Sequence, residues 1–253
     1  MPDLRVVAYN ILDGGIGRAD PLAEVILAQK PDVVCLVEAD DHEVRDRIAW
    51  RLGFDQIAAE GRDGRTSVLM TRGTIATSVN VTGDDKPRSL LLAEVAIDGI
   101  QLGVAVAHFT GRPSNERELV RQREADALLA TCAAWRSAGR PHVLAGDFNS
   151  TSPGQRVDLD ALPPKVRPHV EANGNTLPRD VIRAIVEAGY VDTMLGDDAS
   201  HATTFTTQHP ALRLDYVFAH GCEPVDCRVE TDRLAKAASD HFPVVATVRV
   251  PGA

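Results

Sequence analysis

Three aspartates stand beside apolar stretches of this sequence, in the segments AGDFN (145–149), RLDYV (213–217) and SDHFP (239–243). An isolated carboxylate at such a place is costly, because burial removes its hydration. Converging carboxylates also repel one another unless they are paired, protonated or bound to a metal ion. Either Asp147, Asp215 and Asp240 are unrelated surface charges, or they meet around a positive group.

Further polar residues stand at the ends of other strand-like runs: Asn10, Glu38, His108, Asn149 and His241. Taken singly, each has a structural explanation: asparagine forms turns, Glu38 could cap a following helix, and Asp215 could pair with Arg213. Taken together, Glu38 and the three aspartates would form an oxygen-rich pocket suited to a hard cation such as Mg²⁺ or Mn²⁺. The two histidines would supply proton transfer near neutral pH.

The elements that must position these residues are mostly short strands. Strand-like runs are predicted at 4–10, 33–38, 67–71, 90–97, 100–108, 142–147, 214–219 and 244–250. Asp98-Gly99 separates two of these runs by two residues, which is a strong signal for a tight hairpin. At least part of the sheet structure is therefore expected to be antiparallel.

Helical patterns alternate with the strands. Helices are expected to start at Asp20-Pro21, to end at Gly53, to occupy 115–136 and to end again at Gly189. The segment 159–178 is rich in Pro, Asn and Gly and predicts a long ordered loop, which is often functional. No composition break marks a domain boundary, so one α+β domain over residues 1–253 is expected, with two packed sheets and outer helices. Trp50 and Trp135 fall on apolar helix faces and are expected in the core.

The composition indicates an acidic globular protein. Of 253 residues, 44% are hydrophobic and 25% charged, and the formal net charge is −9. Such a charge argues against broad non-specific affinity for nucleic acid or anionic membrane, which rests on a basic face. No apolar run approaches the ~20 residues that cross a bilayer, so no integral membrane association is expected. The absence of a signal-peptide pattern together with that of a membrane span predicts a cytoplasmic protein. The four cysteines show no zinc-like spacing, and no obligate protein partner is evident.

Six short motifs occur in an order that resembles a known family. They are AYN (8–10), LVE (36–38), AHF (107–109), GDFNS (146–150), RLDYV (213–217) and SDHFP (239–243). The set resembles the endonuclease/exonuclease/phosphatase superfamily, the relatives of DNase I, abasic-site endonucleases, sphingomyelinases and inositol-polyphosphate phosphatases. The resemblance spans residues 5–250. It implies a four-layer α/β/β/α sandwich, in agreement with the two-sheet domain expected above, and a metal-dependent phosphoester hydrolase.

The resemblance also implies a metal site. Glu38 matches the family's main metal-binding glutamate, and Asn10 and Asp240 match residues beside the metal. The implied cofactor is Mg²⁺ or Mn²⁺, which would neutralise charge on the transferring group and the departing oxygen.

The remaining matched residues correspond to those that act on water and phosphate. Asp147 and Asn149 match the pair that positions the attacking water and the phosphate oxygens. Asp215 matches the residue that orients the histidine of the SDH motif, here His241. His108 matches a histidine that contacts the scissile phosphate. The implied reaction is in-line attack of water on a phosphoester, with His241 and Asp147 sharing the activation of that water.

Two features near His108 depart from or add to the family pattern. Ala107 stands where many relatives carry threonine. The charged segment 111–124 either forms a solvated helix with ion pairs one turn apart or brings Arg112 or Arg117 to the substrate phosphate, which the forked guanidinium fits.

Three functions are therefore weighed. The first is a phosphodiesterase or phosphatase acting on a small or lipid-derived phosphoester, which the acidic balance favours. The second is a nuclease, which would need basic or aromatic residues to grip a strand. The third is a non-catalytic relative that binds a partner, which the complete set of polar residues argues against.

Overall fold

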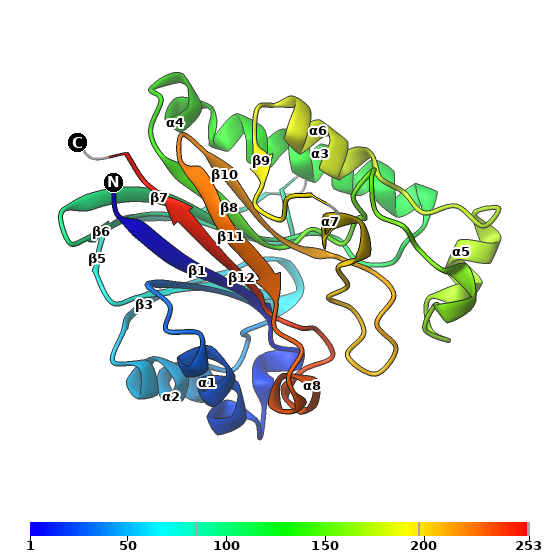
Figure 1. Ribbon diagram of the computed structural model, residues 1–253, viewed down its shortest axis with the longest axis horizontal. Helices are drawn as coiled ribbons and strands as arrows, with labels where there is room; N and C mark the ends of the chain where they lie inside the picture. The colour runs from blue at the N-terminus through cyan, green and yellow to red at the C-terminus, as the bar shows by residue number, and fades with distance from the viewer. Residues whose placement is uncertain (84–85, 197, 252–253) are drawn as a thin grey trace.

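Two six-stranded sheets form the centre of the molecule in a computed structural model that describes residues 1–83, 86–196 and 198–251. The first sheet has the order β11-β12-β1-β2-β4-β3, and the second has the order β5-β6-β7-β8-β10-β9. Figure 1 shows the strands stacked between two groups of helices. This is the α/β/β/α sandwich that the sequence predicted.

The first sheet is built from both ends of the chain. Its strands are β1 (Asp3–Asn10), β2 (Val33–Val37), β3 (Asp55–Glu60), β4 (Thr66–Thr71), β11 (Glu223–Val229) and β12 (Val244–Arg249). β1 pairs parallel with β2, and the pairs of β1 with β12, β2 with β4, β3 with β4 and β11 with β12 are antiparallel. The sheet is therefore mixed, with its one parallel pair at the centre.

The second sheet repeats this plan. Its strands are β5 (Thr74–Asn80), β6 (Ser89–Ile97), β7 (Ile100–His108), β8 (His142–Asp147), β9 (Val191–Asp192) and β10 (Asp215–His220). β7 and β8 form the parallel pair, and the other neighbours are antiparallel. The predicted Asp98-Gly99 hairpin joins β6 to β7, and both turn residues have the positive φ, 51° and 82°, that such a tight turn requires.

The helices cover the two outer faces. They are α1 (Ala19–Ala28), α2 (His42–Leu52), α3 (Asn115–Thr131), α4 (Ala133–Ser137), α5 (Arg167–Ala172), α6 (Asp180–Glu187), α7 (Asp198–His201) and α8 (Arg233–Ala238), with 3-10 turns η1 (Asp13–Gly15), η2 (Arg62–Gly64) and η3 (Leu159–Ala161). In Figure 1, α1, α2 and α8 lie below the strands, and α3, α4 and α6 lie above them. Several helix ends follow local rules: Asp41 caps α2 by accepting from Val44 N at 3.0 Å, and Gly53 ends that helix in the left-handed conformation, as predicted.

The core consists of three apolar layers that follow from these faces. Val, Leu and Ala side chains fill the space between the sheets, including Val6 on β1, Val33 on β2 and Val104 on β7. A second layer packs the first sheet against α1, α2 and α8. A third packs the second sheet against α3 and α6. Strands buried on both faces read as continuous apolar runs, which is why the sequence located them.

Three predictions about local structure were wrong. α1 begins at Ala19, so Asp20 lies inside its first turn instead of capping it. The segment 159–178 contains η3 and α5 and is not wholly a loop. Trp50 is 71% exposed on the outer side of α2, beneath the guanidinium of Arg47, and is not a core residue. At about 100° per residue, Trp50 lies about 120° from Val44 and about 160° from Ile48 around α2, so the helical period itself directs Trp50 away from the packed side.

Trp135 is half-buried against the third apolar layer, and its indole Nε1 donates to Glu94. Across the described residues, none of the helices combines the length and the hydropathy needed to cross a membrane.

Candidate active site

The parallel pair in each sheet ends at the same edge of the sandwich. In the first sheet Asn10 is in register with Val37, so Glu38 follows directly beside it. In the second sheet His108 is in register with Asp147. Because the carboxyl ends of parallel strands meet at one edge, four of the polar residues singled out in the sequence come together there.

The other two motifs reach this edge through antiparallel partners. Asp215 opens β10 and is in register with Asp147, the last residue of β8. β12 runs antiparallel to β1, so the residues before it lie near the end of β1. The hydroxyl of Ser239 donates to the carbonyl oxygen of Asn10 at 2.7 Å and ties the SDH segment to that strand end. Asp240 and His241 are therefore placed at the same edge.

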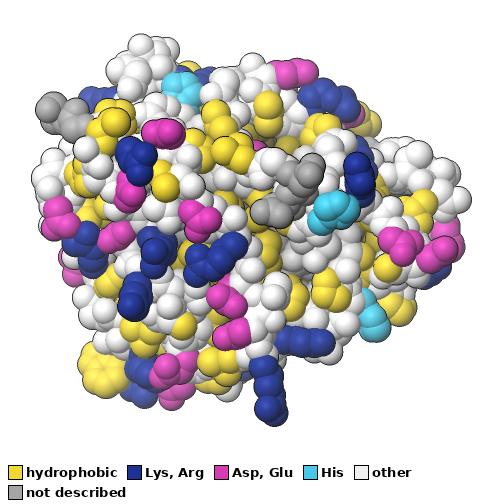
Figure 2. Space-filling model, in the orientation of Figure 1, with side chains coloured by type: hydrophobic (Ala, Val, Ile, Leu, Met, Phe, Trp, Pro, Cys, Tyr) yellow, Lys and Arg dark blue, Asp and Glu magenta, His cyan; other side chains and the backbone are white. Residues whose placement is uncertain are grey.

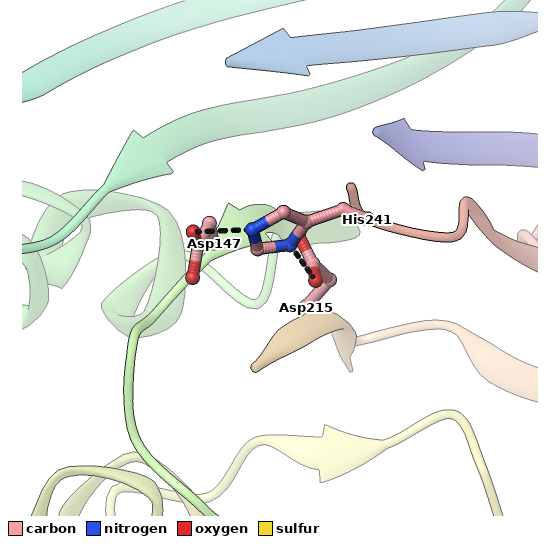
Figure 3. Close-up of side chains that lie close together, drawn as sticks. All are labelled: Asp147, Asp215 and His241. Carbon is pink, nitrogen blue, oxygen red and sulfur yellow. Dashed lines mark hydrogen bonds and ion pairs between the residues drawn. The ribbon is translucent and has the colours of Figure 1, made fainter. Parts of the chain in front are cut away.

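His241 lies between two carboxylates (Figure 3). Its Nδ1 is 2.7 Å from Oδ2 of Asp215, and its Nε2 is 3.9 Å from Oδ2 of Asp147. All three side chains are buried, and their ligand-type atoms lie within 4.8 Å of one another. The hydrogen bond to Asp215 fixes the ring, so Nε2 is the atom that faces Asp147 and the open side of the site.

Charges within this group shift its proton affinities. Burial lowers the pKa of His241, but the charge of Asp215 and its hydrogen bond outweigh burial and raise this pKa to about 10. Burial, followed by the charge of Asp215, raises the pKa of Asp147 to about 7. At neutral pH the proton therefore stays on His241, and the Asp147 carboxyl is the member of the pair that can accept one.

Asn10 links this cluster to Glu38. Its amide nitrogen donates to Oε1 of Glu38 at 3.2 Å and to Oδ2 of Asp147 at 3.1 Å. Its amide oxygen accepts from the backbone N–H of Leu12 at 3.0 Å, which sets the orientation of the amide. Asn10 thus holds two carboxylates of different sheets at one point.

His108 is buried at the same point. Its Nε2 lies 3.7 Å from Oε1 of Glu38 and 3.8 Å from Oδ2 of Asp147. Burial lowers the pKa of His108 to about 3, against the opposing charge of Glu38. The ring is therefore neutral at neutral pH, and its Nδ1 has no hydrogen-bond partner among the described residues.

Glu38 is surrounded by donors. Burial raises its pKa, but the charge of His108, the N–H of Asp13 at 3.1 Å and the charge of Arg65 together lower this pKa to about 2. Since His108 is neutral at neutral pH, the Asp13 amide and Arg65 keep Glu38 ionised there. Glu38 also has a φ of 54°, a strained value for this residue type that recurs at functional sites.

Sequence reasoning missed Arg65. Its guanidinium contacts Oε2 of Glu38 at 3.0 Å, together with Asp40 at 2.9 Å and Asp13 at 3.0 Å. Arg65 precedes β4, which runs antiparallel to β2, so it falls beside the end of β2. In the sequence, Arg65 stands just before a predicted strand. Its position beside Glu38 can be recognised only when the pairing of β4 with β2 is known.

Asn149 and Gly146 shape the turn after β8. The N–H of Asn149 donates to Oδ1 of Asp147 at 2.8 Å, and its side-chain amide donates to the carbonyl oxygen of Phe109 at 3.1 Å. Asn149 has a positive φ of 49°. A Cβ on Gly146 would lie 2.1 Å from the carbonyl oxygen of Ala107, so the close approach of β8 to β7 requires glycine there.

The two candidate phosphate-binding arginines lie in different places. Arg112 is exposed and lines a cavity together with Asn149. Arg117 is exposed in the first turn of α3 and is not among the residues that line this cavity. Asp240 is partly exposed, with Oδ2 bonded to Nζ of Lys165 at 3.0 Å and Oδ1 lying 3.9 Å from Nε2 of His241.

The charged face of α3 is buried, which the sequence did not indicate. Arg121 donates to the carbonyl oxygens of Thr110 at 2.9 Å and Arg112 at 2.8 Å, and it pairs with Glu118 at 2.8 Å. Glu124 accepts from the backbone and the hydroxyl of Thr110 at 2.8 and 2.7 Å. These residues hold the loop that follows His108, so the segment is neither a solvated helix nor a direct phosphate site at these positions.

The chain is similar to known proteins both in its sequence pattern and in its fold. The sequence model of the Endonuclease/Exonuclease/phosphatase family matches residues 7–241. No curated protein matches the sequence significantly.

Solved structures share the fold at low identity. The human Nocturnin catalytic domain with bound sulfate anion is 18% identical, with a TM-score of 0.71 over 99% of this chain and 95% of its own. An endonuclease/exonuclease/phosphatase from Beutenbergia cavernae is 24% identical, with a TM-score of 0.68 over 100% and 73%. An AP endonuclease from Archaeoglobus fulgidus is 18% identical, with a TM-score of 0.72 over 96% and 98%.

The family match covers nearly the whole chain, and the two mixed sheets with flanking helices are the DNase I-like fold. Members of the matched family are phosphoester hydrolases. This chain belongs to the endonuclease/exonuclease/phosphatase family.

Proposed function

We propose that the protein is a metal-dependent phosphoester hydrolase in which His241 and Asp147 activate the attacking water. The observation that carries this proposal is the position of His241, bonded to Asp215 at 2.7 Å through Nδ1 and facing Asp147 at 3.9 Å through Nε2. Asp147 can accept the proton of the water, because His241 already holds a proton at neutral pH. Asp215 holds the imidazolium in place, and the imidazolium stabilises the Asp147 carboxylate beside it.

The other residues have separate functions in this proposal. Asp147 accepts the proton of the water, which attacks the phosphorus in line with the departing oxygen. Asn149, whose backbone is bonded to Asp147, orients a phosphate oxygen. His108, neutral and with Nε2 facing Glu38 and Asp147, contacts another. Arg112 is exposed on the neighbouring loop and would approach the phosphate as a cation.

The donor chemistry fits a hard divalent cation. The oxygens of Glu38 and Asp147 converge within hydrogen-bond distance of one amide, and Oδ1 of Asp215 is buried without a partner among the described residues. Arg65 pairs with Glu38, and Lys165 pairs with Asp240. Within the described part of the chain, Asp147 and Asp215 share His241 alone as their cation, so carboxylates are in excess at this edge. Glu38 and Asp240 would hold Mg²⁺ or Mn²⁺, with Asn10 beside it. When bound, the ion would neutralise charge on the phosphate and on the departing oxygen.

A small or lipid-derived phosphoester is the substrate that we favour. The net charge is −9, and basic and acidic side chains are interspersed over the face shown in Figure 2. A strand-binding groove is expected to be basic and lined by aromatic rings. The four free cysteines suit a reducing compartment, and we propose the cytoplasm. A nuclease is the second candidate, because one of the similar structures is an AP endonuclease.

One panel tests the proposal. Purified protein is assayed with Mg²⁺ and with Mn²⁺ against bis-p-nitrophenyl phosphate, p-nitrophenyl phosphate, plasmid DNA and a phospholipid. Diester cleavage without plasmid nicking supports the favoured substrate class, efficient nicking supports the nuclease, and no turnover of any of the four supports a binding-only relative.

Glu38→Ala and His241→Ala are the two variants that should lose activity if the proposal is correct. Each is expected to lower turnover by several orders of magnitude while the circular dichroism spectrum stays unchanged. His201→Ala, at an exposed histidine on α7, is the control and should retain wild-type turnover. Near-wild-type activity of His241→Ala would exclude a part for His241 in the activation of the water.

A further inference from the structure

A cavity of about 250 Å³ adjoins the candidate site on the side of Asn149. Asn149 lines it and is bonded through its backbone to Asp147. Phe205 lines it as well, and the ring of Phe205 lies 4.7 Å from the ring of His241, centre to centre. The cavity therefore opens directly beside the residues that would act on the phosphorus.

The wall of the cavity is apolar. Val166, Leu212 and Leu214 line it and belong to a separate buried cluster formed by α5 and the segment before β10. Phe205 packs against this cluster and adds an aromatic face. Such a surface gains free energy by covering an apolar ring, and engineered apolar cavities of about 150 Å³ already hold benzene.

The rim of the cavity is basic. Arg112, Lys165 and His169 line it, and the described lining residues include no carboxylate. Lys165 lies with Nζ 4.7 Å from the centre of the Phe205 ring and 3.0 Å from Oδ2 of Asp240, so it stands between the cavity and the site. Arg112 is exposed on the opposite loop. A cationic rim around an apolar pocket favours a ring that carries an anionic group.

We propose that this cavity binds one ester arm of a small phosphoester, and that this arm is an apolar ring bearing a second anionic group. The inference rests on the proposed function, because the phosphorus of the same molecule would lie at His241 and Asp147. It also gives a function to the segment 159–178: Lys165, Val166 and His169, around the start of α5, form one wall of the cavity, so this part of the segment selects the substrate.

Binding of three phosphonates tests the inference without turnover. Methylphosphonate, phenylphosphonate and 4-carboxyphenylphosphonate are titrated into the full chain in Mg²⁺ by calorimetry. Burial of a ring should lower Kd by about tenfold from methyl to phenyl. The added carboxylate should lower Kd by a further factor of about five. Equal affinity for the three compounds would overturn the inference.

Two variants locate the binding. His169→Trp fills the mouth of the cavity from α5 and should raise Kd for both ring compounds by about tenfold while methylphosphonate stays within about twofold. The same substitution at an exposed histidine outside the cavity, His201→Trp, should change none of the three. Unchanged methylphosphonate binding also demonstrates that the variant is folded. An unaltered Kd of the ring compounds in His169→Trp would contradict the proposal.

Arg112→Gln addresses the second anion through a ratio of affinities, because loss of a contact with the phosphonate itself would weaken all three compounds alike. It should abolish the advantage of the carboxylated ring over the plain ring, whereas Arg156→Gln, which removes the same charge at an exposed position away from the cavity, should preserve it. If Arg112→Gln still binds the carboxylated ring more tightly than the plain ring, the proposed contact of Arg112 with a second anionic group is wrong.

The failure of this inference differs from the failure of the proposed function. Ring-selective binding without hydrolysis of any diester would reject the enzyme and keep the cavity. Hydrolysis of a diester with equal affinity for the three phosphonates would keep the proposed function and reject the binding of a ring in the cavity. Tighter binding of a single-stranded oligonucleotide than of 4-carboxyphenylphosphonate, measured by competition, would assign the cavity to a polymer and overturn the small-molecule class.

Discussion

His241 and Asp215 are joined by a 2.7 Å hydrogen bond between Nδ1 and Oδ2, and both side chains are buried. Because this bond occupies Nδ1, the ring can act only through Nε2, which faces Asp147. The pair therefore couples the orientation of the imidazole of His241, which precedes β12 of the first sheet, to a carboxylate on β10 of the second sheet.

Asp215→Asn should separate orientation from charge. The amide keeps the size of the carboxylate, but it lacks the charge that stabilises an imidazolium and can present an N–H to Nδ1 in place of an acceptor. We expect kcat to fall by roughly 10²–10⁴-fold with KM little changed. Steady-state kinetics on the diester that the wild type cleaves best provides the measurement. A kcat within about twofold of wild type would show that the bond has no part in turnover.

The candidate metal site predicts cation binding that depends on Glu38. Dialysis against a chelator should abolish turnover, and Mg²⁺ or Mn²⁺ should restore it. Water-proton relaxation with Mn²⁺ measures binding without activity. Glu38→Gln should weaken Mn²⁺ by at least about tenfold, because it removes one anionic oxygen ligand. Asp63→Asn is the matched control, since Asp63 has a side chain that is 80% exposed. Equal Mn²⁺ affinity in wild type and Glu38→Gln would exclude this ligand.

The buried pair of Glu118 and Arg121 should matter for stability. Arg121→Met leaves Glu118 buried without its cation, and we expect a loss of about 3–5 kcal/mol in the free energy of unfolding. Arg183→Met breaks a pair of the same spacing whose side chains are about half exposed, and it should cost at most about 1 kcal/mol. Urea unfolding of both variants measures the two losses in free energy of unfolding. Equal losses would contradict the conclusion that Arg121 and Glu118 form a buried pair that holds the loop after His108.

Acid should destabilise the fold partly through His142. This side chain is fully buried, with Nδ1 2.7 Å from the carbonyl oxygen of Arg140 and Nε2 2.8 Å from the hydroxyl of Tyr190. Burial lowers the pKa of His142 from 6.5 to about 4. Between pH 6.5 and about 4, His142 is therefore protonated in the unfolded state and neutral in the folded state. The free energy of unfolding consequently falls as the pH drops from 6.5 towards 4.

His142→Gln removes this contribution. Across that window the free energy of unfolding of the wild type should fall more steeply than that of the variant, by up to about 1.4 kcal/mol per pH unit. Urea titrations at several pH values measure the slopes. His201→Gln, at an exposed histidine, should retain the wild-type slope. Parallel curves for wild type and His142→Gln would show that another group titrates.

The two tryptophans mark a limit of sequence patterns. Trp135 follows Leu128 and Cys132 at helical spacing and is half-buried, whereas Trp50 lies off the side of α2 that carries Val44 and Ile48 and is 71% exposed. The apolar character of Trp50 suggests a core position, but the helical period directs its side chain outward. Similarly, the acids and the arginine of α3 have the composition of a solvated face and are buried because the loop after His108 offers them carbonyl and amide partners.

The sequence by itself determined the inner strands of both sheets, the hairpin at Asp98-Gly99 and the residues at the strand ends, because apolar runs and turn residues act over a few positions. Their order was sufficient to indicate the family. The sequence did not indicate the edge strands β3, β5, β9 and β11, which lack such apolar runs. Tertiary structure alone decided that Asn10 holds Glu38 and Asp147 together, that Arg65 joins Glu38, and that part of 159–178 forms one wall of a cavity beside Asn149. These contacts join residues far apart along the chain, and they follow from strand pairing and sheet packing, which no local pattern encodes.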